Sequence, residues 1–278
     1  DDGIRDSVAS RGLGDVYKRQ VIINMPELRK NRAKQKLKNG ENVIAVSCTD
    51  TDMIDFLGST GAVDVIWVEM EHGEATWSQI SDISRACDLW GMTSLVRVNN
   101  NDPWLVGRAL DRGAQAVLVP HVNTKEEAER LVQGGKYTPE GSRGMFSSRQ
   151  GLGVSDYINK ANDEVMLLAL IEDVVAVENL DEILTVDGVD CFMVVPGDLS
   201  QSMGPEYLGK PSHPDVEKII EDSMKKIASA GYATGSTAGD NNIERWVSAG
   251  GRMFLCSFQG YIQAGLTNLK EKATSAES

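Results

Sequence analysis

The chain has 278 residues, of which 41% are hydrophobic and 25% charged, so it can form one large domain or two small ones with proper cores. Its formal net charge of -13 would repel the phosphate backbone of nucleic acids, which argues against a nucleic-acid partner. No apolar run approaches the roughly 20 residues needed to cross a bilayer, and no cleavable export signal is visible. We therefore expect a cytoplasmic protein without a membrane partner.

The first 20 residues differ from the rest of the chain. Residues 1–20 balance four acidic against four basic side chains and show no hydrophobic periodicity. They resemble translated sequencing adapter, so we interpret them as a non-native segment and expect the native start at Met25. The basic stretch that follows, Leu28 to Lys38, has a helix-forming composition and predicts a short surface helix with a solvated face.

From Asn39-Gly40 onward, short β-branched runs alternate with longer segments whose apolar residues recur every three or four positions. The eight runs are continuously apolar, which is typical of parallel strands covered on both faces. They span residues 43–48, 65–68, 94–98, 116–119, 165–171, 191–195, 232–235 and 253–256. Eight strand–helix units without an internal linker predict an α/β protein with a (β/α)8 TIM barrel as its single domain, residues 25–278, including the N-terminal helix. An open, doubly wound sheet is the alternative.

Polar residues follow several consecutive runs at the point where each predicted strand ends. In chain order they are Glu69-Met70-Glu71-His72, Arg97, Pro120-His121, Glu172-Asp173 and Pro196-Gly197-Asp198. Active sites of (β/α)8 barrels are built at this end of the strands. Two intervals are longer than the others, 120–164 and 196–231, and we interpret them as enlarged loops after strands four and six. The pattern favours a functional site at the mouth of the barrel.

These residue types support one kind of chemistry. Glu172 and Asp198 offer hard oxygen ligands, which suit Mg2+ or Mn2+ rather than a structural zinc. Arg97 can donate two parallel hydrogen bonds to a carboxylate or an enolate oxygen, and His72 fits a base that removes a proton next to a carbonyl. A metal ion and an arginine together stabilise an enolate. The residues alone also allow capping carboxylates, a salt-bridged arginine and a hydrogen-bonded loop histidine.

Eight motifs carry a family resemblance. They are Glu-Met-Glu-His-Gly (69–73), Val-Arg-Val-Asn-Asn-Asn-Asp (96–102), Leu-Asp-Arg-Gly-Ala (110–114), Val-Pro-His-Val (119–122), Tyr-Thr-Pro-Glu-Gly-Ser-Arg-Gly (137–144), Ile-Glu (171–172), Gly-Val-Asp (188–190) and Pro-Gly-Asp-Leu-Ser-Gln-Ser-Met-Gly (196–204). In this order they resemble the HpcH/HpaI aldolases, metal-dependent class II 2-oxo-acid aldolases of the 4-hydroxy-2-oxoheptanedioate aldolase type. The resemblance covers roughly residues 28–266. It implies a barrel of the pyruvate/phosphoenolpyruvate type in a homo-oligomer, a hexamer or a trimer, whose neighbouring subunits complete the sites.

The resemblance also implies roles for individual residues. Glu172 and Asp198 match the metal ligands, for Mg2+, Mn2+ or Co2+, and the backbone amides of Gly197 and Asp198 match those that hold the pyruvate carboxylate. Arg97 matches the arginine that stabilises the enolate, and His72 matches the histidine that acts as acid and base.

Two further matches are less specific. Asp111 matches an aspartate that supports the catalytic histidine, and Arg143, followed by Gly144, matches a substrate-facing arginine. On sequence grounds alone, Asp111 could as easily cap or salt-bridge a helix, and Arg143-Gly144 could be a turn. His121 could serve as a second base if its loop brings it inward, and His213 is expected to be a surface or capping residue.

The chain departs from the family pattern at three positions. Glu69 replaces a common Asp, Leu170 replaces a common Gln that would contact pyruvate, and Val195 replaces a common Gly ahead of the sixth-strand motif. The sequence therefore indicates a divergent member of the family, in which metal and pyruvate binding are better supported than the choice of aldehyde.

We predict a class II aldolase, a carbon–carbon lyase that reversibly cleaves a 4-hydroxy-2-oxo acid to pyruvate and an aldehyde through a metal-stabilised enolate. No lysine stands at a strand end, which argues against a Schiff-base aldolase. Three alternatives stay open. They are an oxaloacetate decarboxylase, which would form the same enolate, a non-catalytic barrel that binds metal and oxo acids, and a CoA-thioester lyase of the citrate lyase β type.

Overall fold

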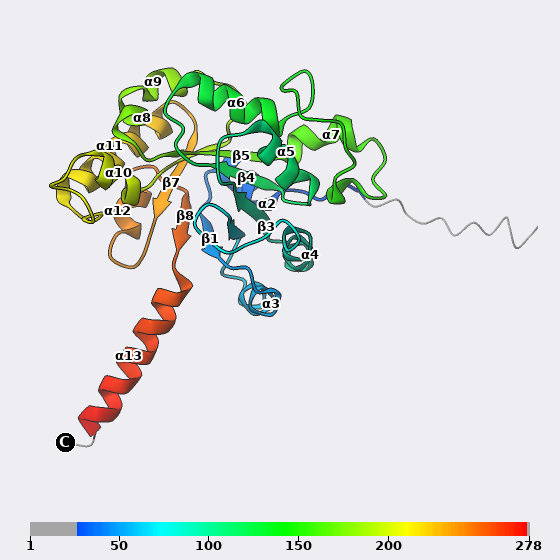
Figure 1. The fold of residues 1–278 in the computed structure, drawn as a ribbon. Coiled ribbons are helices and arrows are strands. Elements are labelled where there is room, and N and C mark those ends of the chain that lie inside the picture. The colour runs from blue at the N-terminus through cyan, green and yellow to red at the C-terminus, as the bar shows by residue number, and fades with distance from the viewer. Residues whose placement is uncertain (1–26, 277–278) are drawn as a thin grey trace, which may run out of the picture.

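The computed structural model describes residues 27–276 and has a closed barrel of eight parallel strands, in which each strand pairs with its neighbour in chain order and β8 pairs with β1 (Figure 1). The strands are β1 (Val43–Ser47), β2 (Val65–Glu69), β3 (Thr93–Arg97), β4 (Ala116–Val119), β5 (Met166–Ile171), β6 (Cys191–Val194), β7 (Ala233–Thr237) and β8 (Met253–Cys256). Every strand boundary lies within two residues of the predicted one. The (β/α)8 barrel is confirmed and the open sheet is excluded. The predictions for residues 1–20 and for Met25 lie outside the described residues.

Helices connect the strands and cover the outside of the barrel. They are α2 (Arg32–Lys38), α3 (Thr51–Ser59), α4 (Ile80–Trp90), α5 (Pro103–Asp111), α6 (Lys125–Gly135), the 3-10 turn η1 (Arg149–Gly151), α7 (Tyr157–Glu164), α8 (Val174–Glu178), α9 (Leu180–Ile183), α10 (Pro196–Ser202), α11 (Pro214–Ser229), α12 (Ile243–Ser248) and α13 (Phe258–Ala276). None of the helices within residues 27–276 is both long and apolar enough to span a membrane.

The strands bury both of their faces. Alternate residues point into the barrel, where Trp67, Leu95, Leu118, Leu168 and Met193 belong to one apolar cluster. The residues between them point outward and pack with the helices in a second, larger cluster. This two-sided burial explains why each run in the sequence is continuously apolar rather than alternating.

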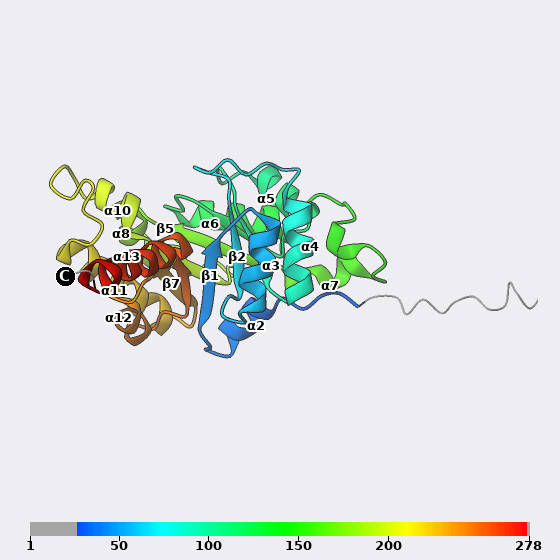
Figure 2. The ribbon, with the colours of Figure 1, turned by 90° about the horizontal axis from the view of Figure 1, so that it is seen from below.

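Helix α2 is more than the solvated surface helix that the sequence predicted. Figure 2 shows it at the end of the barrel where β1 begins, and its Ala33 and Leu37 side chains join the apolar cluster of the interior. The ammonium group of Lys34 is also buried, where it donates to the carbonyl of Val165 at 2.7 Å and lies 3.1 Å from a carboxylate oxygen of Asp190. Helix α2 therefore closes the amino-terminal end of the barrel, opposite the mouth.

The two long intervals differ from each other. In the first, helix α6 begins at Lys125, soon after β4, and the extra chain, residues 136–164, lies between α6 and β5. Because the end of α6 faces the start of β5, this extra chain belongs to the amino-terminal end of the barrel, and the expected enlarged loop after strand four is wrong. In the second interval, residues 203–213 connect α10 to α11 at the carboxyl end, as expected.

Helix α13 projects from the end of β8 away from the barrel (Figure 1). None of its 19 residues is buried, and the large apolar side chains Tyr261, Ile262, Leu266 and Leu269 are 49–63% exposed. Phe258 packs against the core and the hydroxyl of Tyr261 donates to Asp240 at 3.1 Å, but a helix of this length gains most of its stability from packing an apolar face, and the large apolar side chains beyond its first turn stay exposed among the described residues.

The side chain of Asn31 joins three segments of the closed end. Its Oδ1 caps α2 by accepting from the backbone N–H of Lys34 at 3.0 Å, and it also accepts from the hydroxyl of Thr93 at 2.9 Å. Its Nδ2 donates to the carbonyls of Gln115, at 3.1 Å, and Glu164, at 3.0 Å. Asn31 is completely buried, so water does not compete with it for these hydrogen bonds.

We expect Asn31→Ala to lower the free energy of unfolding by about 3 kcal/mol, because it removes a helix cap and leaves buried polar groups unpaired. Asn39→Ala, at the exposed end of the same helix, is the matched control and should change stability by less than about 0.5 kcal/mol. Urea unfolding followed by circular dichroism measures both. Equal effects of the two substitutions would contradict the structural role of Asn31.

Candidate active site

Glu69 fixes Arg97 at the mouth of the barrel. The register of β2 and β3 places the two residues opposite each other at the ends of their strands. Oε2 of Glu69 accepts from Nε of Arg97 at 2.6 Å and from the indole N–H of Trp67 at 3.2 Å. Its Oε1 accepts from the backbone N–H groups of Glu71, at 2.7 Å, and His72, at 3.2 Å. The departure from the common Asp therefore gives a carboxylate that holds Arg97 and the turn after β2, and does not contact the His72 ring.

Glu71 lies between the arginine and two imidazole rings. Its Oε2 is 2.9 Å from a terminal nitrogen of Arg97 and 3.9 Å from Nε2 of His72. Its Oε1 is 3.9 Å from Nε2 of His121. The sequence placed Glu71 at a strand end but gave it no role. Its position next to His72 was the available signal.

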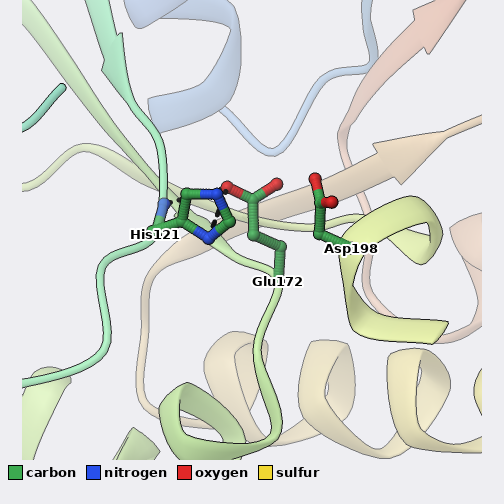
Figure 3. Close-up of side chains that lie close together, drawn as sticks. All are labelled: His121, Glu172 and Asp198. Carbon is green, nitrogen blue, oxygen red and sulfur yellow. Dashed lines mark hydrogen bonds and ion pairs between the residues drawn. The ribbon is translucent and has the colours of Figure 1, made fainter. Parts of the chain in front are cut away.

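A second group of polar residues follows β4, β5 and β6. Glu172 comes directly after β5, is only 1% exposed, and accepts at Oε1 from the backbone N–H of His121 at 2.9 Å. Asp198 lies in the first turn of α10. One ring nitrogen of His121 and one oxygen from each carboxylate all lie within 4.8 Å of one another, and Figure 3 shows the Glu172 carboxylate between the other two side chains. Asp173 accepts from or donates to Nδ1 of His121 at 2.8 Å, depending on their protonation.

The environment of this group changes two pKa values. Burial raises the pKa of Glu172 to about 7, and the charges of Asp198 and Glu71 act in the same direction, while the backbone N–H and the ring of His121 oppose them. Burial lowers the pKa of His121, but the hydrogen bond to Asp173 and the neighbouring carboxylates outweigh it, so the net shift is upward. The upward shift of the His121 pKa reflects the surrounding carboxylates, whereas that of Glu172 comes mainly from burial, with the neighbouring negative charges adding to it.

This spot suits a divalent cation. Oε2 of Glu172 is buried and has no hydrogen-bond partner among residues 27–276, which is costly for a carboxylate unless a cation takes that place. Oxygen donors from Glu172 and Asp198 are those that Mg2+ and Mn2+ prefer. The two residues predicted as metal ligands are therefore brought together, and their chemistry fits such an ion.

Gly197 also lies where the sequence placed it. It is in the first turn of α10, where backbone N–H groups have no partner within the helix. A Cβ added at Gly197 would meet no atom within 4 Å, so the space beside it is open. Leu170 is buried in the interior cluster, and Val195 packs against it, so these two departures form an apolar floor below the polar groups.

Asp111 and Arg143 are not part of this cluster in the single chain. Asp111 ends α5, which runs from the carboxyl end of β3 to the start of β4, so it belongs to the closed end of the barrel. Its carboxylate binds the guanidinium of Arg143 at 2.7 Å, and the Arg143 side chain is 1% exposed and stacks over the ring of Tyr137. No contact joins either residue to His72 within residues 27–276. Their predicted roles at the mouth stay predictions.

The two remaining histidines have different positions. His121 turns inward toward the carboxylates, as its use as a second base would require. His213 caps α11, because its Nδ1 accepts from the backbone N–H of Asp215 at 3.2 Å, and this confirms its expected capping role.

Comparison with known proteins agrees with this geometry. Residues 41–255 match the HpcH/HpaI aldolase/citrate lyase family. The chain belongs to this family. It is 34% identical over 229 residues to a hydroxypyruvate/pyruvate aldolase of Roseobacter denitrificans, covering 80% of this chain and 88% of the relative. It is 35% identical over 238 residues to a 2-keto-3-deoxy-L-rhamnonate aldolase of Klebsiella pneumoniae, covering 83% and 88%.

Solved structures show the same fold. An HpcH/HpaI aldolase/citrate lyase family protein from Burkholderia cenocepacia superposes with a TM-score of 0.79 at 28% identity, covering 88% of this chain and 100% of that protein. The predicted family, the barrel and the enzyme class, a carbon–carbon lyase of the aldolase type, are confirmed. The non-catalytic alternative is thereby set aside. The family is metal-dependent, in keeping with the carboxylates at the mouth.

We expect Glu172→Gln to abolish most binding of Mn2+, because it removes the charge of a buried ligand. Loss of a residue that hydrogen-bonds to a metal ligand typically lowers metal affinity by about 10- to 100-fold, and we expect the loss of the ligand Glu172 itself to lower it further. Isothermal titration calorimetry of the chelator-treated protein measures it. Glu178→Gln, an exposed position on α8, is the matched control and should bind like the parent. Full Mn2+ affinity in the Glu172 variant would show that the ion binds elsewhere.

Proposed function

We propose that the protein is a class II aldolase that reversibly cleaves a 4-hydroxy-2-oxo acid to pyruvate and an aldehyde. The observation that carries this proposal is the placement of Arg97 and the Glu172–Asp198 pair around one barrel mouth, joined through Glu71 and His121. The aldolase relatives support the same reaction class, because they are named for pyruvate, hydroxypyruvate or a 2-keto-3-deoxy sugar acid. We also propose that residues 25–278 make up the native single domain.

In this proposal, Glu172 and Asp198 hold Mg2+ or Mn2+, with Co2+ as a further option. When bound, the ion supplies a Lewis acid that draws electron density from the keto oxygen of the substrate. The backbone N–H groups at Gly197 and Asp198 hold the substrate carboxylate. Leu170 and Val195 contribute no hydrogen bond, so the polar contacts of pyruvate come from the residues around them.

Arg97 has the part of an electrostatic stabiliser. Glu69 and Glu71 fix its guanidinium with contacts of 2.6 and 2.9 Å, so little conformational freedom is lost when substrate binds. Its remaining donors stabilise the negative charge that develops on the enolate oxygen. His72, whose ring is near Glu71, takes the C3 proton of pyruvate in the addition direction and returns it in cleavage.

We expect Arg97→Ala to slow the metal-dependent exchange of the pyruvate C3 protons for deuterium by at least about 100-fold, because enolate charge would lose its fixed donor. Proton NMR of pyruvate in D2O measures the rate, with a chelator as the blank. Arg85→Ala, which removes an exposed arginine of α4, is the matched control and should exchange at the parent rate.

An unchanged exchange rate in the Arg97 variant would refute its assigned role. If the parent protein exchanges the protons and also releases CO2 from oxaloacetate faster than it cleaves any hydroxy-oxo acid, the decarboxylase is the main activity. Both reactions pass through the same enolate, so proton exchange alone does not separate them. The comparison of hydroxy-oxo acid cleavage with CO2 release does.

We also propose that the enzyme is a homo-oligomer, a hexamer or a trimer, in which Asp111 and Arg143 act at the mouth of a neighbouring copy. The support is twofold. The apolar residues of α13 are exposed in the single chain, and Asp111 and Arg143 lie at the closed end of their own barrel. A second copy would bury the apolar side chains of α13, and Arg143, whose side chain is 1% exposed, would turn outward to reach the mouth of that copy.

We expect the double substitution Ile262→Asp and Leu266→Asp to shift the protein toward monomers, because it places charges on the apolar side chains of α13. Size-exclusion chromatography with light scattering gives the mass. Gln263→Asp with Thr267→Asp adds the same charge to neighbouring exposed positions of the helix and is the matched control. A monomeric parent protein would contradict the proposed assembly, and an unaltered mass in the first variant would exclude α13 from its interface.

A further inference from the structure

His121 has an uncommon backbone conformation that places it at the metal-ligand pair. Its φ of 51° lies in the left-handed region, which residues other than glycine rarely adopt. In this conformation the backbone N–H of His121 donates to Oε1 of Glu172 at 2.9 Å, and Nδ1 of the ring lies 3.7 Å from the same oxygen. The chain therefore bends after β4, and both the backbone N–H and the ring of His121 lie close to the buried carboxylate of Glu172.

The charges around the ring come from four carboxylates. Glu71, Glu172 and Asp173 lie 2.8–3.9 Å from ring nitrogens of His121, and Asp198 completes the group within 4.8 Å. The guanidinium that contacts Glu71, that of Arg97, is also paired with Glu69. The buried Oε2 of Glu172 has no partner among the described residues. The site thus presents a nitrogen donor, two carboxylates and uncompensated negative charge at one point.

We propose that His121 is a third protein ligand of the metal ion, so that the ion is held by one imidazole and two carboxylates. This rests on the proposed function, which places the ion at Glu172 and Asp198. Ligands at roughly 2.1 Å from one ion lie about 3 to 4 Å apart, so the observed spread of up to 4.8 Å closes with a small rotation of side chains. Figure 3 shows the three side chains converging from separate elements.

Asp173 fits the same arrangement. Histidine ligands of metal ions usually donate their second ring N–H to a carboxylate or a carbonyl, which fixes the ring and its tautomer. Asp173 is the carboxylate at hydrogen-bond distance from His121, 2.8 Å from Nδ1, so in this arrangement Nδ1 donates to Asp173 and Nε2 is the nitrogen that binds the ion. The residue has no other ion pair or side-chain hydrogen bond among residues 27–276. It is therefore a positioning residue for His121.

A nitrogen ligand has a consequence for the choice of metal. Imidazole binds Mn2+ and Co2+ far better than Mg2+, which keeps oxygen ligands and water. The two-carboxylate set alone would serve Mg2+ and Mn2+ alike. With His121 in the set, the enzyme prefers the transition metals, and removal of the imidazole abolishes that preference.

The test measures metal binding to the full-length protein, independently of turnover. Calorimetry gives the dissociation constants for Mn2+, Co2+ and Mg2+ in the parent and in His121→Gln, Asp173→Asn and His213→Gln. We expect His121→Gln, which removes a direct ligand, to weaken Mn2+ and Co2+ by at least about 100-fold and Mg2+ by less than about 3-fold, since an outer partner alone contributes about 10- to 100-fold. Asp173→Asn should show a smaller loss in the same direction. His213→Gln, which removes a histidine from the start of α11, should match the parent.

Co2+ gives a second readout. Proton NMR of the Co2+-loaded parent in H2O should show a strongly shifted, exchangeable signal from a coordinated imidazole, and His121→Gln should lose it. Absence of this signal in the parent, or an unchanged ratio of Mn2+ to Mg2+ affinity in His121→Gln, would overturn the proposal. If His121→Gln does not fold, the signal should persist in His72→Gln and His213→Gln, because the chain has 3 histidines and His121 is the remaining one, and loss of the signal in either variant would overturn the proposal.

The outcomes also separate this inference from the proposed function. Metal-dependent exchange of pyruvate protons without any contribution of His121 to metal binding leaves the aldolase in place and removes the third ligand. A His121-dependent metal preference without exchange keeps the ligand and removes the aldolase. A parent protein that binds none of the three metals removes both.

Discussion

The buried carboxylate of Glu172 is the constraint around which the mouth of the barrel is organised. One of its oxygens is held by the backbone of His121, and the other is buried without a partner. A carboxylate in this position costs free energy unless it is protonated or paired with a cation. Burial has raised its pKa to about 7, so the metal-free protein meets this cost partly by protonation. A divalent ion bound at Glu172 would remove this cost and thereby stabilise the folded protein.

The excess of carboxylates at the mouth also affects the order in which a metal ion and an anionic substrate can bind. Pyruvate is an anion, yet the mouth carries Glu69, Glu71, Glu172, Asp173 and Asp198, with Arg97 as the cation fixed among them. Without a metal ion, the field of these carboxylates would oppose an anionic substrate. Once the ion binds, the ion and Arg97 face the substrate as two positive centres. In the proposed reaction we therefore expect the metal ion to bind before pyruvate.

The sequence predicted the parts of the structure that depend on local patterns. Continuous apolar runs located all eight strands, because a strand buried on both faces admits no alternation, and polar residues after them located Arg97, Glu172 and Asp198 at one mouth. It did not predict the burial of α2, because a lysine such as Lys34 is usually solvated. Only the folded structure places Asp190 and the carbonyl of Val165 beside it. The contact of His121 with Asp173 joins residues 52 positions apart, and only the barrel closure brings them together.

In a single chain, the His72 side chain is exposed and lies far from the residue predicted to support it. Its side chain is 68% exposed, and Glu71, which is 3.9 Å from its ring, also binds Arg97. A base that takes a proton from carbon works best where water is excluded and its ring is held. The residue expected to hold it, Asp111, lies at the opposite end of the same barrel, paired with Arg143. In the proposed homo-oligomer, the closed end of a second copy would cover the exposed His72 and bring an Asp111 to this mouth, so one contact would supply both features that the single chain lacks.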